Sequence, residues 1–442
     1  MSARFVSIDR ETPMLLPPDL REWVAEDDLA HFILEVLKGV DMSAAKVNVR
    51  GSGDEQYPPG MLLGVMIYCY ATGIFGSRKI EQATFHHVAV RYLAANTHPD
   101  HDTLCTFRRE NAALLKAALH EVLELGAQLG LGRVGTVCLD GTKILANAAK
   151  RKTSSAARLE ARERYLSQEI EQLMEKAERA DTSPIDDGSK LPRELARRRQ
   201  MQARVQAARE LLGQQCKERA QRRALEREAS LKEAFGEAPR ALQEEAQADD
   251  VINLSDPQSA LMPQPGGGYV QGYNAQIVLS AEAQGGLIVG AHVCTAPNDR
   301  EQLLSAVASI APHVPVHEMV VDSGYDHIRH IHQLEQQREL KVYCSPQGSR
   351  AGEAKSKRRQ SARRAKASAA REQMRQRAQS AHGQELLARR KMTVEPVFGQ
   401  IKEVLGFRRF RLRGLAKVNL EWDLVAVAFN CRRLARRWRA KS

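Results

Sequence analysis

The stretch TVCLDGTKI, residues 136–144, decides how the C-terminal part of the chain folds, because it joins an apolar strand to a charged side chain. Thr136 to Leu139 have the pattern of a buried strand, and Asp140 and Gly141 follow at once. An unpaired carboxylate beside an apolar core is costly to bury. Two interpretations are open at this point. Asp140 is either a turn residue that happens to follow a strand, or a charge that is required at the end of that strand.

A second apolar strand runs into an aspartate in the same way. In HEMVVDSGYDH, residues 317–327, the apolar run leads into Asp322 and a Ser-Gly turn. Carboxylates at the ends of neighbouring strands can share a divalent cation, and Mg²⁺ prefers such oxygen ligands. Two metals about 4 Å apart, which clamp the attacking and leaving oxygens in phosphoryl transfer, require a third carboxylate. The two aspartates therefore predict a magnesium site that is completed elsewhere in the chain.

The positive charge of the chain is concentrated in two segments. The 442 residues carry a net charge of +12. Residues 350–377 contain eleven Lys or Arg against two Glu, and residues 402–442 contain twelve against three acidic residues, which is +9 in each segment. A single basic run is commonly a solvated tail, but two runs that flank a candidate site favour a polyanionic partner. Nucleic acid is therefore the expected partner.

No segment predicts export or insertion into a membrane. Seven cysteines are scattered without a CxxC pair, so the sequence indicates neither a zinc ribbon nor a disulfide framework, and reduced thiols fit best. The first residues lack the apolar run of a signal peptide. The most apolar stretch, residues 61–75, is too short to span a bilayer comfortably and predicts a buried core helix. We expect a cytoplasmic protein that associates with the nucleoid.

Residues 1–130 predict an all-α domain. Apolar residues at 29, 32, 33, 36 and 37 have the spacing of one helix face, and further helical segments follow. Arg108 and Arg109 stand near an expected helix start. Short helices in series, with basic residues near their starts, are typical of helix-turn-helix binders of DNA. A plain helical bundle explains these signals nearly as well.

Residues 155–245 predict two long charged helices. Leu159, Leu166 and Leu173 lie seven residues apart and form a short heptad seam. Residues 181–192, DTSPIDDGSKLP, have the composition of a turn. Two long helices joined by such a turn predict a protruding antiparallel hairpin, and a dimerising coiled coil is the competing interpretation.

The chain after residue 269 predicts strands and then helices. Residues 269–295 hold two β-rich runs around AEAQGG, which is a hairpin signal, and a helix, the strand before Asp322 and a further helix follow. This order of strand, hairpin, helix, strand and helix matches a ribonuclease-H-like sheet, in which the third carboxylate lies on a later helix. Glu395 is the candidate, because Lys402 lies two helical turns further on the same face. Residues 350–380 have no apolar period and predict a partly disordered basic linker.

Several motifs together resemble the DDE transposases of bacterial insertion sequences, of the eleven-eighty-two type. They are VCLDGTKILANA, GYVQGYNAQIVL, APNDREQLL, VVDSGY and TVEPVFGQIKEVLGFRRFRLRGLAKV, and LLPPDLREWVAEDDLAHFILEVL, ATGIFGSRKIE and HPDHDTLCTFRR in the helical N-terminal part. The resemblance implies a Mg²⁺-dependent polynucleotidyl transferase, with Mn²⁺ as an alternative metal. It implies that Asp140, Asp322 and Glu395 are the metal-binding and catalytic triad. The implied partner is double-stranded DNA, both element ends and target, bound by a homodimer.

This resemblance also implies a domain plan. A helical DNA-binding domain covers residues 1–130. An α/β ribonuclease-H-like DDE domain covers residues 136–442, interrupted by a helical hairpin at 150–250 and a basic linker at 350–380.

One departure from the family pattern concerns the residues before Glu395. The broader group has a Tyr seven residues before the glutamate and an Arg four residues before it, where this chain has Ala388 and Lys391. Lys391 keeps the charge of Arg but not its bidentate fork, so Arg389 or Arg390 is expected to serve instead. Pro396 restricts Glu395 and is tolerable if Thr393 caps a new helix.

The segment after Glu395 predicts a basic strip, residues 407–413. Phe407, Phe410 and Leu412 alternate with arginines, so the apolar side can dock on the core while the arginines meet phosphates. The expected DNA-binding residues are Lys402, Lys391, Arg390, Arg408, Arg409, Arg411, Arg413, Arg108 and Arg109.

Two alternative functions remain open at this stage. One is a ribonuclease-H-like nuclease that cuts without joining, and the other is a non-catalytic nucleic-acid binder with a decayed site.

Overall fold

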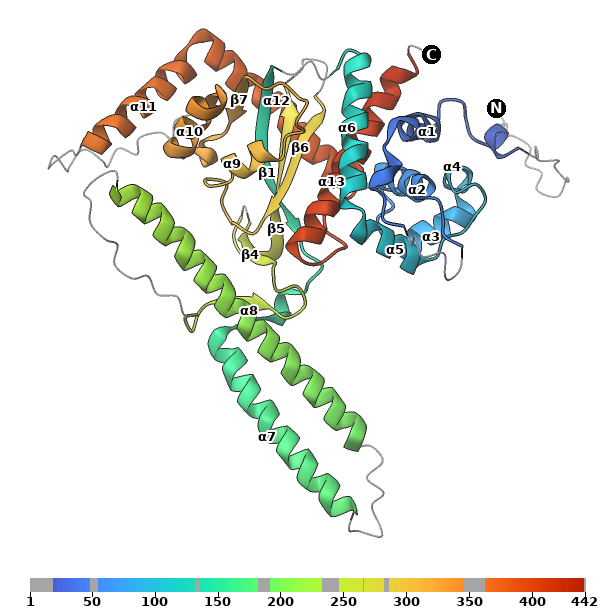
Figure 1. Ribbon diagram of the computed structural model, residues 1–442, viewed down its shortest axis with the longest axis vertical. Coiled ribbons are helices and arrows are strands. Elements are labelled where there is room, and N and C mark those ends of the chain that lie inside the picture. Colours follow the sequence, from blue (N-terminus) through green and yellow to red (C-terminus); the bar gives the residue numbers. More distant parts are fainter. Residues whose placement is uncertain are drawn as a thin grey trace, which may run out of the picture.

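The computed structural model describes residues 19–47, 55–131, 135–181, 191–232, 246–264, 266–281, 286–344 and 362–440 (Figure 1). The predicted turn at 181–192 falls almost wholly outside these residues, as does the first part of the predicted linker, up to residue 361. The remainder of that linker is not irregular. It forms helix α11 (Ala362–Gln379), a regular element within the range predicted as a partly disordered linker.

Short helices make up the N-terminal region, as the sequence predicts. Aspartates cap two of them: Asp28 accepts a hydrogen bond from the N–H of Ala30 at 2.8 Å, and Asp100 accepts one from Thr103 at 2.7 Å. Every residue from Leu62 to Ala71 is buried, which confirms the predicted core helix. No helix in the described part of the chain is long and apolar enough to cross a membrane. The elements are η1 (Leu20–Trp23), α1 (Leu29–Gly39), η2 (Met42–Ala44), α2 (Pro59–Ala71), α3 (Ser77–His86), α4 (Val88–Leu93), α5 (His101–Glu110) and α6 (Ala112–Gln128).

A mixed sheet forms the centre of the C-terminal part, with six strands among the described residues. Strand β1 lies in its middle, antiparallel to β5 on one side and parallel to β7 on the other. Strand β5 continues antiparallel to β4 and β6, and β7 continues parallel to β8. The strands are β1 (Thr136–Leu145), β4 (Ala260–Pro263), β5 (Tyr269–Ser280), β6 (Ile288–Cys294), β7 (Glu318–Val321) and β8 (Lys341–Cys344).

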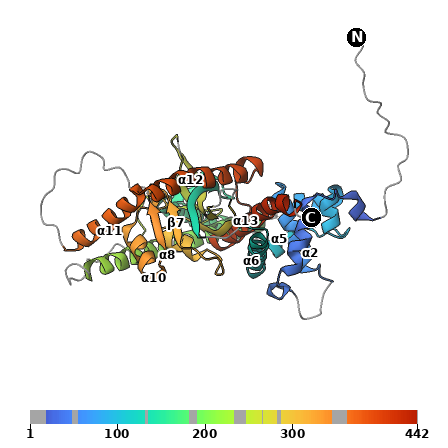
Figure 2. The same cartoon turned by 90° about the horizontal axis from the view of Figure 1, so that it is seen from above.

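Helices cover both sides of this sheet. Seen from above, α12 and α10 lie on opposite sides of β7 (Figure 2). Helix α12 packs against β1, β7 and β8. The helices are α9 (Leu303–Ala308), η4 (Ser323–Tyr325), α10 (Ile328–Arg338), α12 (Ala381–Gly399), the π-helix η5 (Gln400–Val404) and α13 (Leu415–Trp438).

A helical hairpin is inserted between β1 and the rest of the sheet. Helices α7 (Ala156–Asp181) and α8 (Leu191–Lys232) pack on each other, and α7 projects away from the sheet (Figure 1). At its base η3 (Lys150–Lys152) precedes the short strands β2 (Thr153–Ser155) and β3 (Val251–Asn253), which pair antiparallel. Leu159 and Leu166 of the heptad seam are buried against α8 in a separate small core. The chain therefore satisfies this part of the seam within itself, as the hairpin interpretation predicts.

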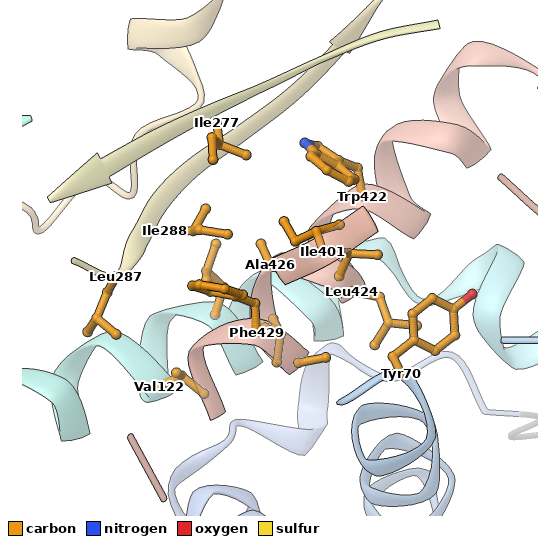
Figure 3. Packing of buried hydrophobic residues seen from close by; sticks show 14 of the residues in the cluster. Tyr70, Val122, Ile277, Leu287, Ile288, Ile401, Trp422, Leu424, Ala426 and Phe429 are labelled. Carbon is orange, nitrogen blue, oxygen red and sulfur yellow. The ribbon is translucent and has the colours of Figure 1, made fainter. Parts of the chain in front are cut away.

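Helix α13 joins the two predicted domains. It packs on α1, α2, α5 and α6 of the N-terminal region and on β6 of the sheet. Trp422 donates a hydrogen bond from Nε1 to the carbonyl of Gln276 at 2.9 Å, and Asn430 both donates to and accepts from the backbone of Ile288. Figure 3 shows apolar side chains of α13, among them Trp422, Leu424 and Phe429, packed between sheet residues and Tyr70 of α2. The N-terminal helices and the sheet thus share one continuous apolar core.

A buried ion pair ties α5 to α13, and it corrects one prediction. Arg108 is 4% exposed, donates to the Tyr70 hydroxyl and to the carbonyl of Phe75 at 2.8 Å each, and lies 3.9 Å from Glu421. Glu421 has no exposed surface. Arg108 therefore stabilises the fold and is not placed to bind DNA, because its charge is needed beside a buried carboxylate. Arg109, the next residue, is exposed.

Replacing Arg108 by alanine should destabilise the protein, and replacing Arg109 should not. Removing one partner of a buried ion pair typically costs roughly 3–5 kcal/mol, whereas an exposed substitution usually changes stability by about 0.5 kcal/mol or less. Urea denaturation of Arg108→Ala and Arg109→Ala, followed by circular dichroism, measures both. Equal stability of the two variants would contradict this role for Arg108.

Candidate active site and nucleic-acid interface

Asp140 lies inside strand β1 and does not end it, contrary to the expectation from the sequence. The strand continues to Leu145 because β5 pairs with it along this whole length. The parallel neighbour β7 is shorter, and its pairing with β1 ends at Cys138 and Val320. Asp140 therefore lies just beyond the point where β1 loses its partner on one side only.

Asp322 lies opposite Asp140, just beyond the end of this parallel pairing. The parallel register pairs Cys138 with Val320, so its continuation by two residues places Asp140 across from Asp322. Asp322 follows β7 directly and caps η4, accepting a hydrogen bond from the N–H of Gly324 at 2.6 Å. Burial, together with the charges of Asp322 and Asp299, raises the pKa of Asp140 to about 6, although the N–H of Gly141 and the charge of Arg390 act to lower it. The two predicted aspartates thus come close enough to repel each other.

Arg390 is the cation that faces this carboxylate. It lies on α12, is 8% exposed, and its Nη1 is 3.1 Å from Asp140 Oδ2. The sequence proposed Arg389 or Arg390 in place of the family arginine, and Arg390 is the one that makes this contact. The prediction that Arg390 binds DNA is corrected in part, because its guanidinium group is already bound to the carboxylate of Asp140. Lys391 is exposed on the same helix.

Glu395 lies on α12 with an exposed side chain. The expected helix break before it is absent: α12 runs from Ala381 to Gly399 with Pro396 inside it. Thr393 does not cap a new helix, because its hydroxyl donates back to the carbonyls of Arg389 and Arg390. Asp140, Asp322 and Arg390 thus lie together, and Glu395 is the exposed residue of the predicted triad.

Lys402 reaches the same face of β1 as Asp140. Its Nζ donates to Thr142 Oγ1 at 2.5 Å, and Thr142 is two residues from Asp140 in the strand, so both side chains point to one face. The π-helix η5 carries Lys402 and begins directly after α12. A π-turn changes the angle between successive side chains, and such turns are frequent at functional sites. The position of Lys402 therefore does not follow from a regular spacing of two helical turns after Glu395, because the π-helix lies between the two residues. Burial lowers the pKa of Lys402.

A third aspartate, Asp299, stands at this end of the sheet and was not predicted as a site residue. Its Oδ1 accepts hydrogen bonds from Asn274 Nδ2 and Gln276 Nε2, both at 2.7 Å. Gln276 in turn accepts a hydrogen bond from the Tyr325 hydroxyl. In the sequence, Asp299 was part of the motif APNDREQLL, which contributed to the family resemblance but did not indicate a function for this aspartate.

Gly141 is explained by this network. A Cβ atom at Gly141 would overlap Gln276 Nε2 and lie 2.8 Å from Asp299 Oδ1. The strand therefore needs glycine here to let the Gln276 side chain approach, and not to make a turn. Asp140 and Gly141 are adjacent because one supplies a carboxylate on one face of β1 and the other leaves room on the opposite face.

The basic strip has the two sides that its sequence predicts. Phe407 and Phe410 have no exposed surface and Leu412 is buried, while the four arginines between and after them are exposed, which confirms the alternation. The strip begins after Gly406 and ends before Gly414, both of which have positive φ. Its backbone pairs with the end of β1, where the N–H of Phe410 donates to the carbonyl of Leu145 at 2.9 Å.

The arginines of the strip differ in how much charge they leave free. Arg408 forms an ion pair with Glu403. Arg409 and Arg413 each donate to a backbone carbonyl just after β1, of Ala146 at 3.4 Å and of Asn147 at 2.9 Å. Carbonyl partners orient these guanidinium groups without neutralising them. The exposed cations next to the C-terminal end of β1 are thus mainly Arg409, Arg411 and Arg413.

Two family models match parts of the chain. Residues 339–435 match the model of a transposase DDE domain, and residues 18–110 match the model of a transposase domain, DUF772. The first match contains Glu395 and Lys402, and the second covers the helices up to α5. No curated protein and no solved structure matches the chain. The two matched segments, one similar to a transposase DDE domain and one to a transposase domain, lie towards opposite ends of the chain and share the large apolar core.

Proposed function

We propose that the protein is a transposase that cuts DNA at the ends of an insertion sequence and joins them to a target. The observation that carries this proposal is the meeting of Asp140 and Asp322 where the shorter parallel neighbour of β1 ends. The element order of a ribonuclease-H-like fold, with β1 central and α12 packed across it, supports the same conclusion. The matches to transposase domains at both ends of the chain support DNA as the substrate. We include in this proposal that the transposase is of the eleven-eighty-two type, which its sequence motifs resemble.

The donor set fits Mg²⁺ or Mn²⁺. Asp140 and Asp322 offer hard oxygen ligands from rigid strand positions, and one arginine is too little positive charge for two close carboxylates and Asp299. Glu395, exposed on α12, is the proposed third ligand. Divalent metals bound there supply charge stabilisation to the attacking and leaving oxygens of a phosphoryl transfer.

The side chains of the chain itself then have separate tasks. Arg390 holds Asp140 in one orientation and offsets part of its charge. Lys402 is fixed against Thr142, two residues along β1 from Asp140, and its ammonium group is proposed to meet the backbone of a bound DNA strand. The exposed arginines of the basic strip extend this positive surface along the end of β1.

DNA recognition is proposed to involve both ends of the chain. The N-terminal segment 1–130 is the proposed reader of the element ends, with Arg109 rather than Arg108 among its contacts. A homodimer on DNA is part of this proposal, because two element ends have to be held for joining.

A nuclease that cuts without joining is the second candidate, since its site would use the same carboxylates. The purified full-length protein, Mg²⁺ and a duplex carrying the ends of its own element distinguish the two. A transposase yields joined products with a target plasmid, whereas a nuclease yields only cut ends.

Substituting any residue of the proposed triad should abolish cleavage and leave DNA binding largely intact. Asp140→Asn, Asp322→Asn and Glu395→Gln keep the size of each side chain and remove a metal-binding charge. Cleavage with Mg²⁺ and gel-shift affinity without metal are measured on the same preparations. Full cleavage by one variant would remove that residue from the site, and Glu395 is tested most directly because it has the least support from contacts.

Replacing Gly141 by alanine should slow cleavage without unfolding the protein. The added methyl group displaces Gln276 and with it the Asp299 carboxylate, and a misplacement of about 1 Å at a site can cost up to roughly a hundredfold in rate. Gly399→Ala is the matched control, because a Cβ there meets no heavy atom within 4 Å. Single-turnover cleavage rates of the two variants decide. Wild-type rates for Gly141→Ala would mean that Asp299 and Gln276 lie outside the working site.

Neutralising two arginines of the basic strip should weaken binding to every DNA sequence alike. Phosphate contacts position a protein on DNA without reading bases. Arg409→Ala combined with Arg411→Ala should therefore reduce the slope of log affinity against log salt by roughly one to two units. Affinities for end-containing and random duplexes across a salt series measure this. An unchanged slope would show that these arginines do not meet the backbone, and a loss confined to one sequence would show that they read bases.

A further inference from the structure

Two histidines and a glutamate form a cluster between helix α6 and the segment that leads into β7. His120 and Glu124 are four residues apart on α6, so they share one face of the helix. His313 lies in the segment between α9 and β7. One nitrogen or oxygen ligand atom from each of the three residues lies within 4.8 Å of the others, and all three side chains are accessible to solvent. None of the three belongs to the site formed by Asp140 and Asp322.

The two imidazole rings approach each other through nitrogen atoms. His120 Nδ1 and His313 Nδ1 are 2.7 Å apart, and the rings meet edge to face with centroids 4.0 Å apart. A neutral imidazole has one donor and one acceptor nitrogen, so this contact is favourable only when one ring carries its proton on Nδ1 and the other does not. Two facing lone pairs would repel each other. A cation bound by both nitrogens removes this repulsion and requires no particular donor.

Glu124 supplies an oxygen beside the second ring nitrogen of His313, and its side chain has to turn towards Nδ1 to share an ion with both rings. Its Oε1 is 3.6 Å from Nε2 of His313. Two imidazoles and one carboxylate are a known ligand set for Zn²⁺, with a fourth position left for water. Zinc–nitrogen bonds of about 2.0–2.1 Å put the two nitrogens of a tetrahedral site roughly 3.3 Å apart. The imidazoles of His120 and His313 thus need to separate by only a fraction of an ångström.

We propose that His120, Glu124 and His313 bind a transition-metal ion, for which Zn²⁺ is the best fit. The imidazole ligands distinguish this site from the carboxylates of the sheet, because Mg²⁺ takes oxygen ligands.

The cluster lies where a bound ion would connect two parts of the fold. Helix α6 packs against α1 and α13, and the segment after His313 is tied to the start of β1 by a hydrogen bond from the N–H of His317 to the carbonyl of Gly135 at 2.8 Å. Strand β7 (Glu318–Val321) follows, and Asp322 comes directly after it. The ion therefore links the helices of the N-terminal half to the strand that carries one of the two close aspartates.

Metal titration of the full-length protein tests this proposal. The protein carries no histidine tag, is stripped with EDTA, and is kept in excess Mg²⁺ so that the carboxylates of the sheet are occupied. Calorimetry with Zn²⁺ gives the stoichiometry and affinity, and visible absorption of Co²⁺ reports the ligand field. We expect one tight Zn²⁺ per chain. His120→Ala and His313→Ala should each weaken binding by more than about tenfold, because even the loss of a residue that only supports a ligand costs roughly 10–100-fold.

A matched control and a second measurement separate binding from folding. His332 is exposed on α10 and lies outside the cluster, so His332→Ala should leave the Zn²⁺ affinity unchanged. Zinc should raise the midpoint of thermal unfolding of the wild type and of His332→Ala but not of His313→Ala, because a ligand that binds only the folded state stabilises it. Wild-type protein that binds no more Zn²⁺ than the double variant His120→Ala, His313→Ala would overturn the proposal, and the cluster would then be a hydrogen-bonded pair of imidazoles.

Discussion

The carboxylate of Glu421 has no exposed surface, and groups from distant parts of the chain surround it. Its Oε1 accepts a hydrogen bond from Tyr70 at 2.7 Å, and its Oε2 accepts from the N–H groups of Arg411 and Leu412 at 2.8 and 2.9 Å. Arg108 supplies the opposite charge. A buried charge without such partners is strongly destabilising. This one residue therefore fixes α2, α5, α13 and the basic strip relative to one another.

The second constraint is the unequal length of the neighbours of β1. Strand β5 pairs with β1 as far as Leu145, while β7 leaves it after Cys138. A strand that is supported on one side and open on the other holds its side chains rigidly and still exposes them to a substrate. Asp140 lies at this position, and the basic strip pairs with β1 a few residues further on. Because Glu421 holds the backbone of that strip, the positive surface and the carboxylates are positioned by the same network.

Helix α12 and the π-helix after it show why residue spacing alone did not predict the structure around Glu395 and Lys402. Pro396 predicted a helix start, but the helix continues through it, because α12 packs along β1, β7 and β8. Tertiary packing outweighs the lost hydrogen bond of one proline. The π-turn then re-aims Lys402 towards Thr142, which a regular period of 3.6 residues does not predict.

By itself the sequence determined the elements whose pattern is local: the buried helix at 61–75, the apolar strands before Asp140 and Asp322, the paired helices of the hairpin, and the alternation of the basic strip. Local periodicity decides which face of an element is buried, and this information lies within a few residues. The tertiary structure alone decided that Arg108 is buried and Arg109 is not, that Arg390 rather than Lys391 meets Asp140, and that Asn274 and Gln276 donate to the Asp299 carboxylate. These outcomes depend on partners more than a hundred residues away or on neighbouring strands, such as Glu421, Asp140 and Gln276, and no local pattern in the chain encodes which of several arginines or aspartates will meet them.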